Sequence, residues 1–218
     1  MLGGKMMLEN YLTIKEEGHH EIIIQKSRFI GYVNRTETEE EAQQFIAKIK
    51  KLHYNATHNC SAYMIGENDL IQKANDDGEP SGTAGVPMLE VLKKMNLKDT
   101  TVVVTRYFGG IKLGAGGLIR AYSNATSEAI KQIGVVERKL MQEIRLTVDY
   151  TLLGKLENEL RSSQYTLGSI DYTDQVSFQM FVPIAEVDEF TNWIIDLTSD
   201  QVNIHNGEQI YKEYDFAL

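Results

Sequence analysis

Several features that define specialised protein classes are missing from this 218-residue chain. Its single cysteine, Cys60, excludes an internal disulfide framework and fits a reducing compartment. No run of residues approaches the roughly 20 consecutive apolar positions of a membrane-spanning helix. The N-terminus also lacks the apolar segment of a secretory signal, so the sequence predicts a cytoplasmic protein with no membrane partner. Residues 1–6 show no pattern and precede a second potential start at Met7; they are interpreted as leader or added residues outside the fold.

Positive charge is scarce overall, but the deficit is confined to one end of the chain. The net charge of −9 by itself argues against nucleic-acid binding. Residues 1–140 carry 18 Lys and Arg against 17 Asp and Glu, whereas residues 141–218 carry 4 against 14. This asymmetry indicates two units with different partners, and we expect any polyanion to contact the N-terminal unit.

The C-terminal part, residues 139–218, follows the pattern of a β-α-β-β-α-β unit. Strands are predicted from alternating apolar residues and helices from apolar residues at helical spacing. The predicted elements are a strand at 143–148, a helix at 152–160, a hairpin with strands at 165–172 and 176–182, a helix at 187–197 and a strand at 202–211. Four strands with two helices on one face form the ferredoxin-like arrangement.

The N-terminal part, residues 7–138, is predicted to mix helices and strands, which makes the whole chain α+β. Thr36-x-x-Glu39 and Thr38-x-x-Glu41 both fit a capping box at the start of its first helix. Its predicted strands lie at 11–15, 21–24, 28–33, 60–65 and 101–105, and its helices cover 42–52, 87–95 and 118–133. The chain has no internal repeat and no low-complexity linker. We place the boundary between the N-terminal and C-terminal parts near Arg138.

An acidic turn, Asn75 to Gly85, contains the first candidate site. Three carboxylates within four residues can bind a divalent cation or act as acid and base, although the spacing is not that of an EF-hand loop. The structural alternative is a turn followed by a helix start that Ser81 or Thr83 caps; a polar binding surface is the third reading. The polar-cleft candidates are His58, Asp76, Asp77, Glu79, Ser81 and Thr83. No resident metal or cofactor is predicted.

A glycine-rich segment, Arg106 to Leu118, is the second candidate site. It follows a β-branched strand and opens a helix, a context that exposes backbone N–H groups at the positive end of a helix. It matches neither a Walker A loop nor the G-x-G-x-x-G dinucleotide fingerprint. Nearby cations suit phosphates and nearby aromatic rings suit bases, whereas the alternative gives the glycines a packing role. The anion-binding candidates are Lys26, Arg28, Arg106, Tyr107, Gly109, Gly110, Lys112, Gly114, Gly116, Gly117 and Arg120.

A histidine and a cysteine form the third candidate. His58 and Cys60 are two residues apart and share one face of a predicted strand, which is compatible with a Cys–His nucleophile pair. A lone cysteine at a strand start is more often a small buried hydrophobic residue, and no activating environment is evident. No catalytic residue is therefore predicted.

Four stretches together resemble the YigZ/IMPACT family. They are Lys26-Ser27-Arg28-Phe29, Thr57-His58-Asn59-Cys60, Asp76 to Gly85, and Arg106 to Leu118. The resemblance implies an N-terminal fold like the second domain of ribosomal protein S-five and a C-terminal domain like the last domain of elongation factor G. Eukaryotic members regulate translation by competing for the activator of a general-control kinase, partly through an extra RWD domain that these 218 residues do not contain.

Three functions fit these observations. The preferred one is a translation-linked accessory protein that binds the ribosome, structured RNA or a translation factor through its N-terminal part. A metal-assisted hydrolase or phosphoryl-handling enzyme using the Asp76 to Glu79 cluster is the second, by analogy at the level of the fold. The third is an adaptor that engages a basic protein through the acidic C-terminal part. A binding protein is thus favoured over an enzyme, and the sequence indicates no oligomeric state.

Overall fold

The computed structural model describes residues 8–66 and 68–218, which form two compact α+β units. The first unit comprises Tyr11–Glu137 with Tyr214–Leu218, and the second comprises residues 8–10 with Arg138–Glu213. A single boundary near Arg138 therefore does not describe the division completely. Residues 8–10 belong to the second unit, and Tyr214–Leu218 belong to the first. The interpretation of residues 1–6 as a leader lies outside the described residues.

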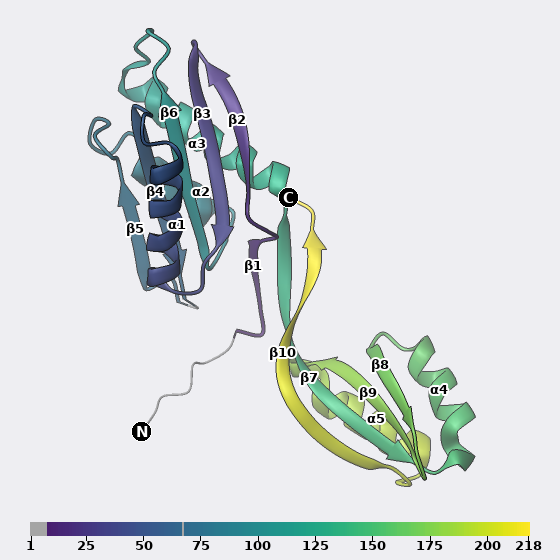
Figure 1. Ribbon diagram of the computed structural model, residues 1–218. Helices are drawn as coiled ribbons and strands as arrows, with labels where there is room; N and C mark the ends of the chain where they lie inside the picture. Colours follow the sequence, from purple (N-terminus) through teal and green to yellow (C-terminus); the bar gives the residue numbers. More distant parts are fainter. Residues whose placement is uncertain (1–7, 67) are drawn as a thin grey trace. The chain divides into compact units, whose positions relative to one another are not determined.

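The first unit is built on a five-stranded antiparallel sheet with helices on both faces (Figure 1). The strand order is β2-β3-β6-β4-β5. The strands are β2 (Gly18–Ile24), β3 (Ser27–Arg35), β4 (His58–Ile65), β5 (Ile71–Asn75) and β6 (Thr100–Tyr107). The helices are α1 (Glu39–Leu52), α2 (Gly85–Lys94) and α3 (Gly114–Ile133).

Helix α1 covers one face of this sheet because its apolar residues recur at helical spacing. Ala42, Phe45 and Ile49 are its buried side chains. Thr38 is the cap: its hydroxyl accepts the N–H of Glu41 at 3.2 Å, and the Glu41 carboxylate accepts the N–H of Glu37 at 2.7 Å. Of the two predicted caps, the one at Thr38 is thus confirmed, although the Glu41 carboxylate reaches the N–H of Glu37 and not that of Thr38 as in a regular capping box.

Helices α2 and α3 cover the opposite face and enclose the main core of the unit. The predicted inward side chains of α3 are buried at Leu118, Tyr122, Ala125 and Ala129. They pack with Met88 and Leu92 of α2 and with Val102 and Val104 of β6. The sheet therefore separates the side chains that pack against α1 from those that pack against α2 and α3.

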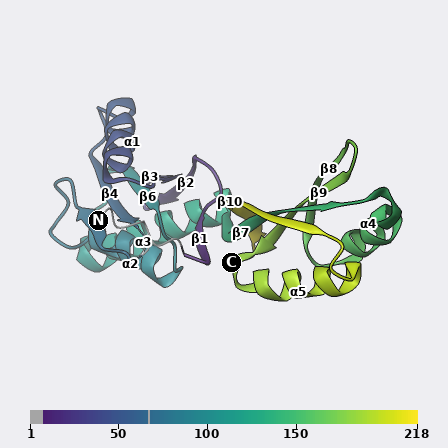
Figure 2. The same cartoon turned by 90° about the horizontal axis from the view of Figure 1, so that it is seen from below.

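The second unit shows the predicted β-α-β-β-α-β order (Figure 2). Its elements are β7 (Val135–Val148), α4 (Leu153–Ser162), β8 (Thr166–Tyr172), β9 (Val176–Pro183), α5 (Val187–Thr198) and β10 (Asn203–Phe216). Single 3₁₀ turns at Tyr150–Leu152 and Ile184–Glu186 lead into the two helices. Strand β7 pairs with β9 and β10, and β8 pairs with β9; β1 (Asn10–Ile14) also pairs with β7.

One strand shows how the sequence pattern sets this unit's core. The predicted inward residues of β9 are all fully buried, and they are Val176, Phe178, Met180 and Val182. Burial of each contributes roughly 1.5–3 kcal/mol relative to exposure. The same cluster holds Leu156 and Leu160 of α4 together with Phe190 and Ile194 of α5, so both helices pack on one face of the sheet. Within the described ranges, no helix has the length and apolarity needed to cross a bilayer.

Candidate functional site

A buried polar cluster centred on Glu79 lies at one end of the first unit's sheet. The Glu79 side chain is 3% exposed. Its Oε1 accepts hydrogen bonds from Arg106 Nη1 at 2.6 Å and from the Tyr122 hydroxyl at 2.7 Å. Its Oε2 lies 3.8 Å from His58 Nε2. The carboxylate of Glu79, in the acidic turn, is thus surrounded by side chains from β6, from α3 and from the first residue of β4.

The register of the strands explains why His58 and Arg106 meet. They are direct cross-strand partners in the β4–β6 pair, so their side chains leave the sheet on the same face. His58 Nδ1 lies 2.8 Å from the carbonyl oxygen of Asp77. Because a carbonyl oxygen only accepts, Nδ1 carries a proton in this contact, which leaves Nε2 as the ring nitrogen that faces Glu79.

Burial decides the chemistry of the two weakly acidic groups beside this cluster. Cys60 is fully buried, and its thiol donates to the carbonyl oxygen of Asp76 at 3.0 Å. Desolvation raises the pKa of Cys60 to about 12, and it also raises the pKa of Tyr122. The burial of Cys60 confirms its interpretation as a small buried residue, and the raised pKa keeps the side chain a thiol at neutral pH.

The prediction that Arg106 binds an external anion is wrong. The residue is 5% exposed, and Glu79 already neutralises it. Its guanidinium lies between two aromatic rings, 5.3 Å from the centroid of Phe29 and 5.5 Å from that of Phe108. Arg106 is thus a structural cation beneath the glycine-rich segment and is withdrawn from solvent.

Asp76 holds the start of α2. Its carboxylate accepts the N–H groups of Gly82 at 2.8 Å, Ala84 at 3.0 Å and Gly85 at 2.8 Å. Burial alone would raise the pKa of Asp76, but these three donors outweigh it and lower the pKa below its ordinary value. The side chain therefore satisfies backbone donors that every helix start leaves without intrahelical partners.

The predicted caps of this helix are wrong. Residue Ala84 precedes α2 and provides no side-chain cap. The hydroxyl of Thr83 donates to the carbonyl oxygen of Pro80 at 2.6 Å, and Ser81 is exposed. Asp76, nine residues before Gly85, accepts the N–H groups of the helix start in their place. Rules that consider only the residues next to a helix start do not predict this arrangement.

The carboxylate of Asp77 is also engaged within the protein. It pairs with Lys50 Nζ at 2.6 Å and accepts the N–H of Asn59 at 2.7 Å. The carboxylates of Asp76, Asp77 and Glu79 thus each bind a different set of protein groups. In the part of the chain that the structure describes, no group of three or more His, Cys, Asp or Glu side chains is arranged to hold a metal ion.

The start of α3 is the accessible part of the glycine-rich segment. Helix α3 begins at Gly114, and the preceding Leu113 offers no side-chain cap. Positive φ angles of 86° at Gly110 and 69° at Gly114 turn the chain into the helix, as glycine readily permits. A Cβ at Gly110, Gly114 or Gly116 would meet no backbone within 3.6 Å.

Exposed cations surround this helix start. Lys112 and Arg120 are exposed and form no ion pair with the described residues. Gly117 and Arg120 line a surface hollow of about 320 Å³ together with Gln25 of the β2–β3 turn and Asn124 of α3. Lys26, also exposed, belongs to the same turn.

Gly109 joins the glycine-rich segment to the β2–β3 turn by close packing. Its N–H donates to Ser27 Oγ at 3.1 Å, so the prediction that this amide binds an anion is wrong. A Cβ on Gly109 would lie 2.0 Å from the backbone carbonyl of Lys26. At this position the packing interpretation of the glycines is the right one.

We expect Gly109→Ala to lower the free energy of unfolding by about 3 kcal/mol, because the backbone of β3 must move to admit a methyl group. Gly116→Ala is the matched control: it lies inside α3 with open space around it, and we expect a gain of about 0.5–1 kcal/mol. Urea denaturation of both variants measures the difference. Equal effects would show that the packing at Gly109 is not close.

Two further anion-binding candidates lie on the other face of the sheet. Tyr107 follows Arg106 on β6 and points the opposite way; its hydroxyl donates to Asn55 Oδ1 at 3.2 Å. Arg28 forms a bidentate pair with Glu21 at 2.8 and 2.9 Å, and its guanidinium lies 5.2 Å from the Tyr107 ring centroid. The structure therefore does not bring Arg28 and Tyr107 together with the start of α3.

A sheet with helices on both faces, an accessible glycine-rich helix start and a β-α-β-β-α-β partner define a two-unit α+β protein. The family model "Impact N-terminal domain" matches residues 25–130, and a "Domain of unknown function (DUF1949)" matches residues 146–201. The chain is 63% identical over 207 residues to the IMPACT family member YvyE of Bacillus subtilis, covering 95% of each chain. The chain belongs to the IMPACT family.

Other relatives show how far this likeness extends. The IMPACT family member YigZ of Escherichia coli is 34% identical, with 88% of this chain and 93% of that protein covered. Protein IMPACT of Mus musculus is 36% identical over 94 residues, which are 41% of this chain and 29% of that protein. A crystal structure of a hypothetical protein matches 93% of this chain and 99% of its own, with a TM-score of 0.59 and 31% identity.

Proposed function

We propose that this protein binds structured RNA of the ribosome through the start of α3 in its first unit. The observation that carries the proposal is the accessible, uncapped beginning of a 20-residue helix at Gly114. It is flanked by Lys112 and Arg120, exposed cations without an ion-pair partner among the described residues. Free N–H groups and the helix dipole attract phosphate at such a position. The protein would act by binding rather than by catalysis.

The surroundings of this helix start also suit a nucleic acid. The side chain of Phe108 is 46% exposed and stands just before the glycines, where a base can stack on it. Lys26 adds a third exposed cation from the adjoining turn. The strong acid excess of residues 141–218 would repel RNA, so the interaction is assigned to the first unit.

The family likeness supports a role in translation. The resemblance implies a pair of folds like the second domain of ribosomal protein S-five and the last domain of elongation factor G, both of which act at the ribosome. The β-α-β-β-α-β order of the second unit is compatible with the latter. The alternative of a metal-assisted hydrolase loses its support, because Asp76, Asp77 and Glu79 are each occupied by protein partners.

Binding to ribosomal particles across a salt series tests the proposal. We expect the double variant Lys112→Ala/Arg120→Ala to bind about tenfold more weakly at low salt and to reduce the slope of log K against log salt by about two units, one for each phosphate that is no longer neutralised. The control Lys93→Ala/Lys131→Ala removes the same charge from exposed helix positions that pair with Glu90 and Glu128. It should bind as the unmodified protein does.

Two results would refute this function. The first is an unmodified protein that stays free of ribosomal particles and of purified ribosomal RNA even at low salt. The second is an equal drop in binding for the two double variants, since this would reveal a response to overall charge alone. Binding to particles but not to purified RNA would assign the interaction to a ribosomal protein, and so would also refute the RNA proposal.

A further inference from the structure

The surface hollow beside the start of α3 has an apolar lining. It lies between the β2–β3 turn and α3, and its volume is about 320 Å³. Ile24 of β2, Leu113 just before α3 and Ala121 of α3 line it. These side chains offer a surface on which a flat ring can pack. The volume is at the lower end of the range of about 300–1,000 Å³ for small-molecule pockets, which suits a single base.

Three polar side chains in the hollow have no partner within the protein. The amides of Gln25 and Asn124 and the guanidinium of Arg120 are exposed, and none of them forms a hydrogen bond or an ion pair with the described residues. Exposed amides usually face water alone, but these two come from separate elements and line one apolar hollow. Each amide holds a donor and an acceptor side by side. The hollow therefore suits a ligand whose edge alternates donors and acceptors in the same way.

The charge around the hollow favours a nucleic acid among such ligands. Arg120 is the charged residue in the described part of its lining, which contains no carboxylate. Lys26 follows Gln25 in the β2–β3 turn and is also exposed. The hollow adjoins the helix start, since Leu113 and Gly117 belong to both. A nucleotide can therefore place its phosphate at the start of α3 and its base in the hollow.

We propose that the hollow receives one unpaired adenine of the bound RNA, an inference that rests on the proposed function. Adenine presents its N6 amino group beside the acceptor N7, an edge that Asn and Gln amides bind with two hydrogen bonds. Its rings pack on the apolar lining, as extruded bases do in protein pockets. Proteins that read RNA sequence target such unpaired bases. Gln25 and Asn124 thus supply a base preference that phosphate contacts at the helix start do not provide.

Fluorescence anisotropy of the full chain at low salt tests this preference. The probes are labelled hexauridylate and three hexamers in which one uridine is replaced by adenosine, guanosine or cytidine, a length within the usual range of single-strand sites. All four carry the same phosphates, so a difference in affinity reports on the base alone. We expect the adenosine hexamer to bind about fivefold more tightly than the other three.

Two variants connect the preference with the hollow. Asn124→Ala and Gln25→Gly should each reduce it to less than about twofold and leave the affinity for hexauridylate unchanged. Glycine suits position 25, where φ is 45°. The control Gln132→Ala removes an exposed amide from the C-terminal part of α3 and should keep the full preference. Lys112→Ala should weaken all four hexamers by the same factor, because it removes a phosphate contact.

The outcomes separate this inference from the function on which it rests. Equal affinity for the four hexamers, or a preference for guanosine or cytidine, would overturn the adenine site and leave RNA binding intact. So would a preference that survives in both Asn124→Ala and Gln25→Gly, or a protein that binds ribosomal RNA but none of the hexamers. A protein that binds neither the hexamers nor ribosomal RNA at low salt would refute both.

Discussion

Replacing Glu79 by glutamine should lower the free energy of unfolding of the first unit by about 3–5 kcal/mol. The carboxylate is the counter-ion of Arg106, and both side chains are almost completely buried. Glutamine has nearly the same shape but no charge, so the guanidinium would remain in the core without compensation. The Tyr122 hydroxyl would lose its charged acceptor as well.

A double-mutant cycle separates this effect from a simple loss of packing. Arg106→Met keeps an apolar side chain between Phe29 and Phe108, and in the double variant Glu79→Gln/Arg106→Met no buried charge is left unpaired. Arg106 Nε also lacks a hydrogen-bond partner in the described part of the chain, so its removal relieves one unsatisfied donor. We therefore expect the double variant to be clearly more stable than Glu79→Gln alone.

Urea denaturation followed by far-UV circular dichroism measures these differences. The fluorescence of Trp193, the single tryptophan, reports separately on the second unit, where it packs against Phe190. Glu90→Gln is the control: this exposed glutamate pairs with Lys93 on α2 and should change stability by less than about 0.5 kcal/mol. Similar values for Glu79→Gln and Glu90→Gln would contradict the assignment of Glu79 as a buried counter-ion.

Asp76→Ala is the second variant for which we expect a large effect, a decrease of about 3 kcal/mol in stability. Alanine would leave three backbone N–H groups at the start of α2 without their acceptor. The control is Asp188→Ala, which removes an exposed carboxylate from the first turn of α5. Since it acts there through the helix dipole alone, its removal should cost about 0.5 kcal/mol.

The pH dependence of the Asp76 effect follows from its lowered pKa. A carboxylate with a lowered pKa in the folded state stabilises the fold fully above its unfolded-state pKa, near 3.8. This stabilisation is lost as the pH falls from there through the folded-state pKa. The difference in unfolding free energy between the unmodified protein and Asp76→Ala should be constant near neutral pH and shrink below pH 3.8. A difference independent of pH in that range would show that the ionised carboxylate is not the acceptor.

Elements with strong periodicity could be predicted from the sequence. The alternation in β9 and the helical spacing in α3 both specify a buried face, and the structure confirms them. Strand β5 was missed because its burial shows no alternation: four of its five residues are exposed at the edge of the sheet. Its last residue, Asn75, also carries the signature of a turn. Edge strands depend on their neighbour for pairing, and a local pattern does not contain that neighbour.

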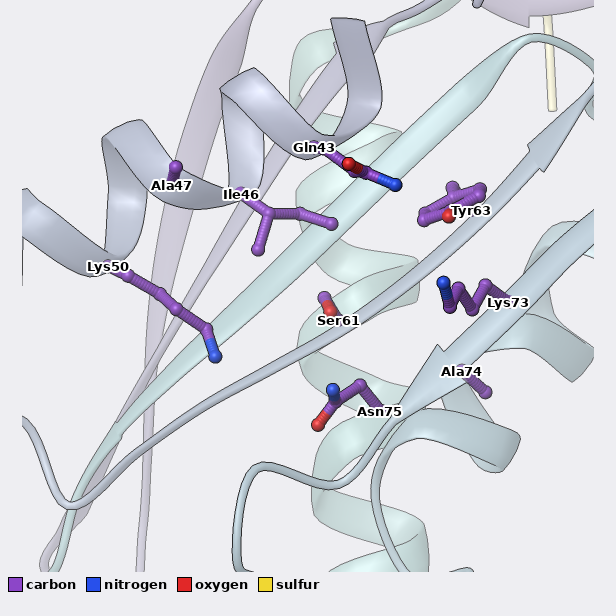
Figure 3. Close-up of a pocket in the computed structure, with 9 residues that line it drawn as sticks. All are labelled: Gln43, Ile46, Ala47, Lys50, Ser61, Tyr63, Lys73, Ala74 and Asn75. Atoms are coloured by element: carbon purple, nitrogen blue, oxygen red, sulfur yellow. The ribbon is translucent and has the colours of Figure 1, made fainter. Parts of the chain in front are cut away.

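The candidate site was predicted only in part, because charge pairing acts between distant segments. The sequence showed Arg106 beside the glycines but not that Glu79, 27 residues earlier, would neutralise it. Tyr122 was predicted as a core residue, and the structure adds that its hydroxyl completes the cluster. The pocket between α1 and the β4–β5 edge of the sheet (Figure 3) could not be predicted, since its lining residues come from three elements that only the folded sheet brings together.

The buried thiol described above gives this protein an intrinsic kinetic probe. Cys60 is the chain's single cysteine, and it lies beneath α2 and α3 in the main core of the first unit. A thiol-specific reagent can modify it only after that core opens, and its raised pKa suppresses reaction in the closed form. The rate of labelling in native buffer would therefore measure how often the core opens, without any introduced label or denaturant.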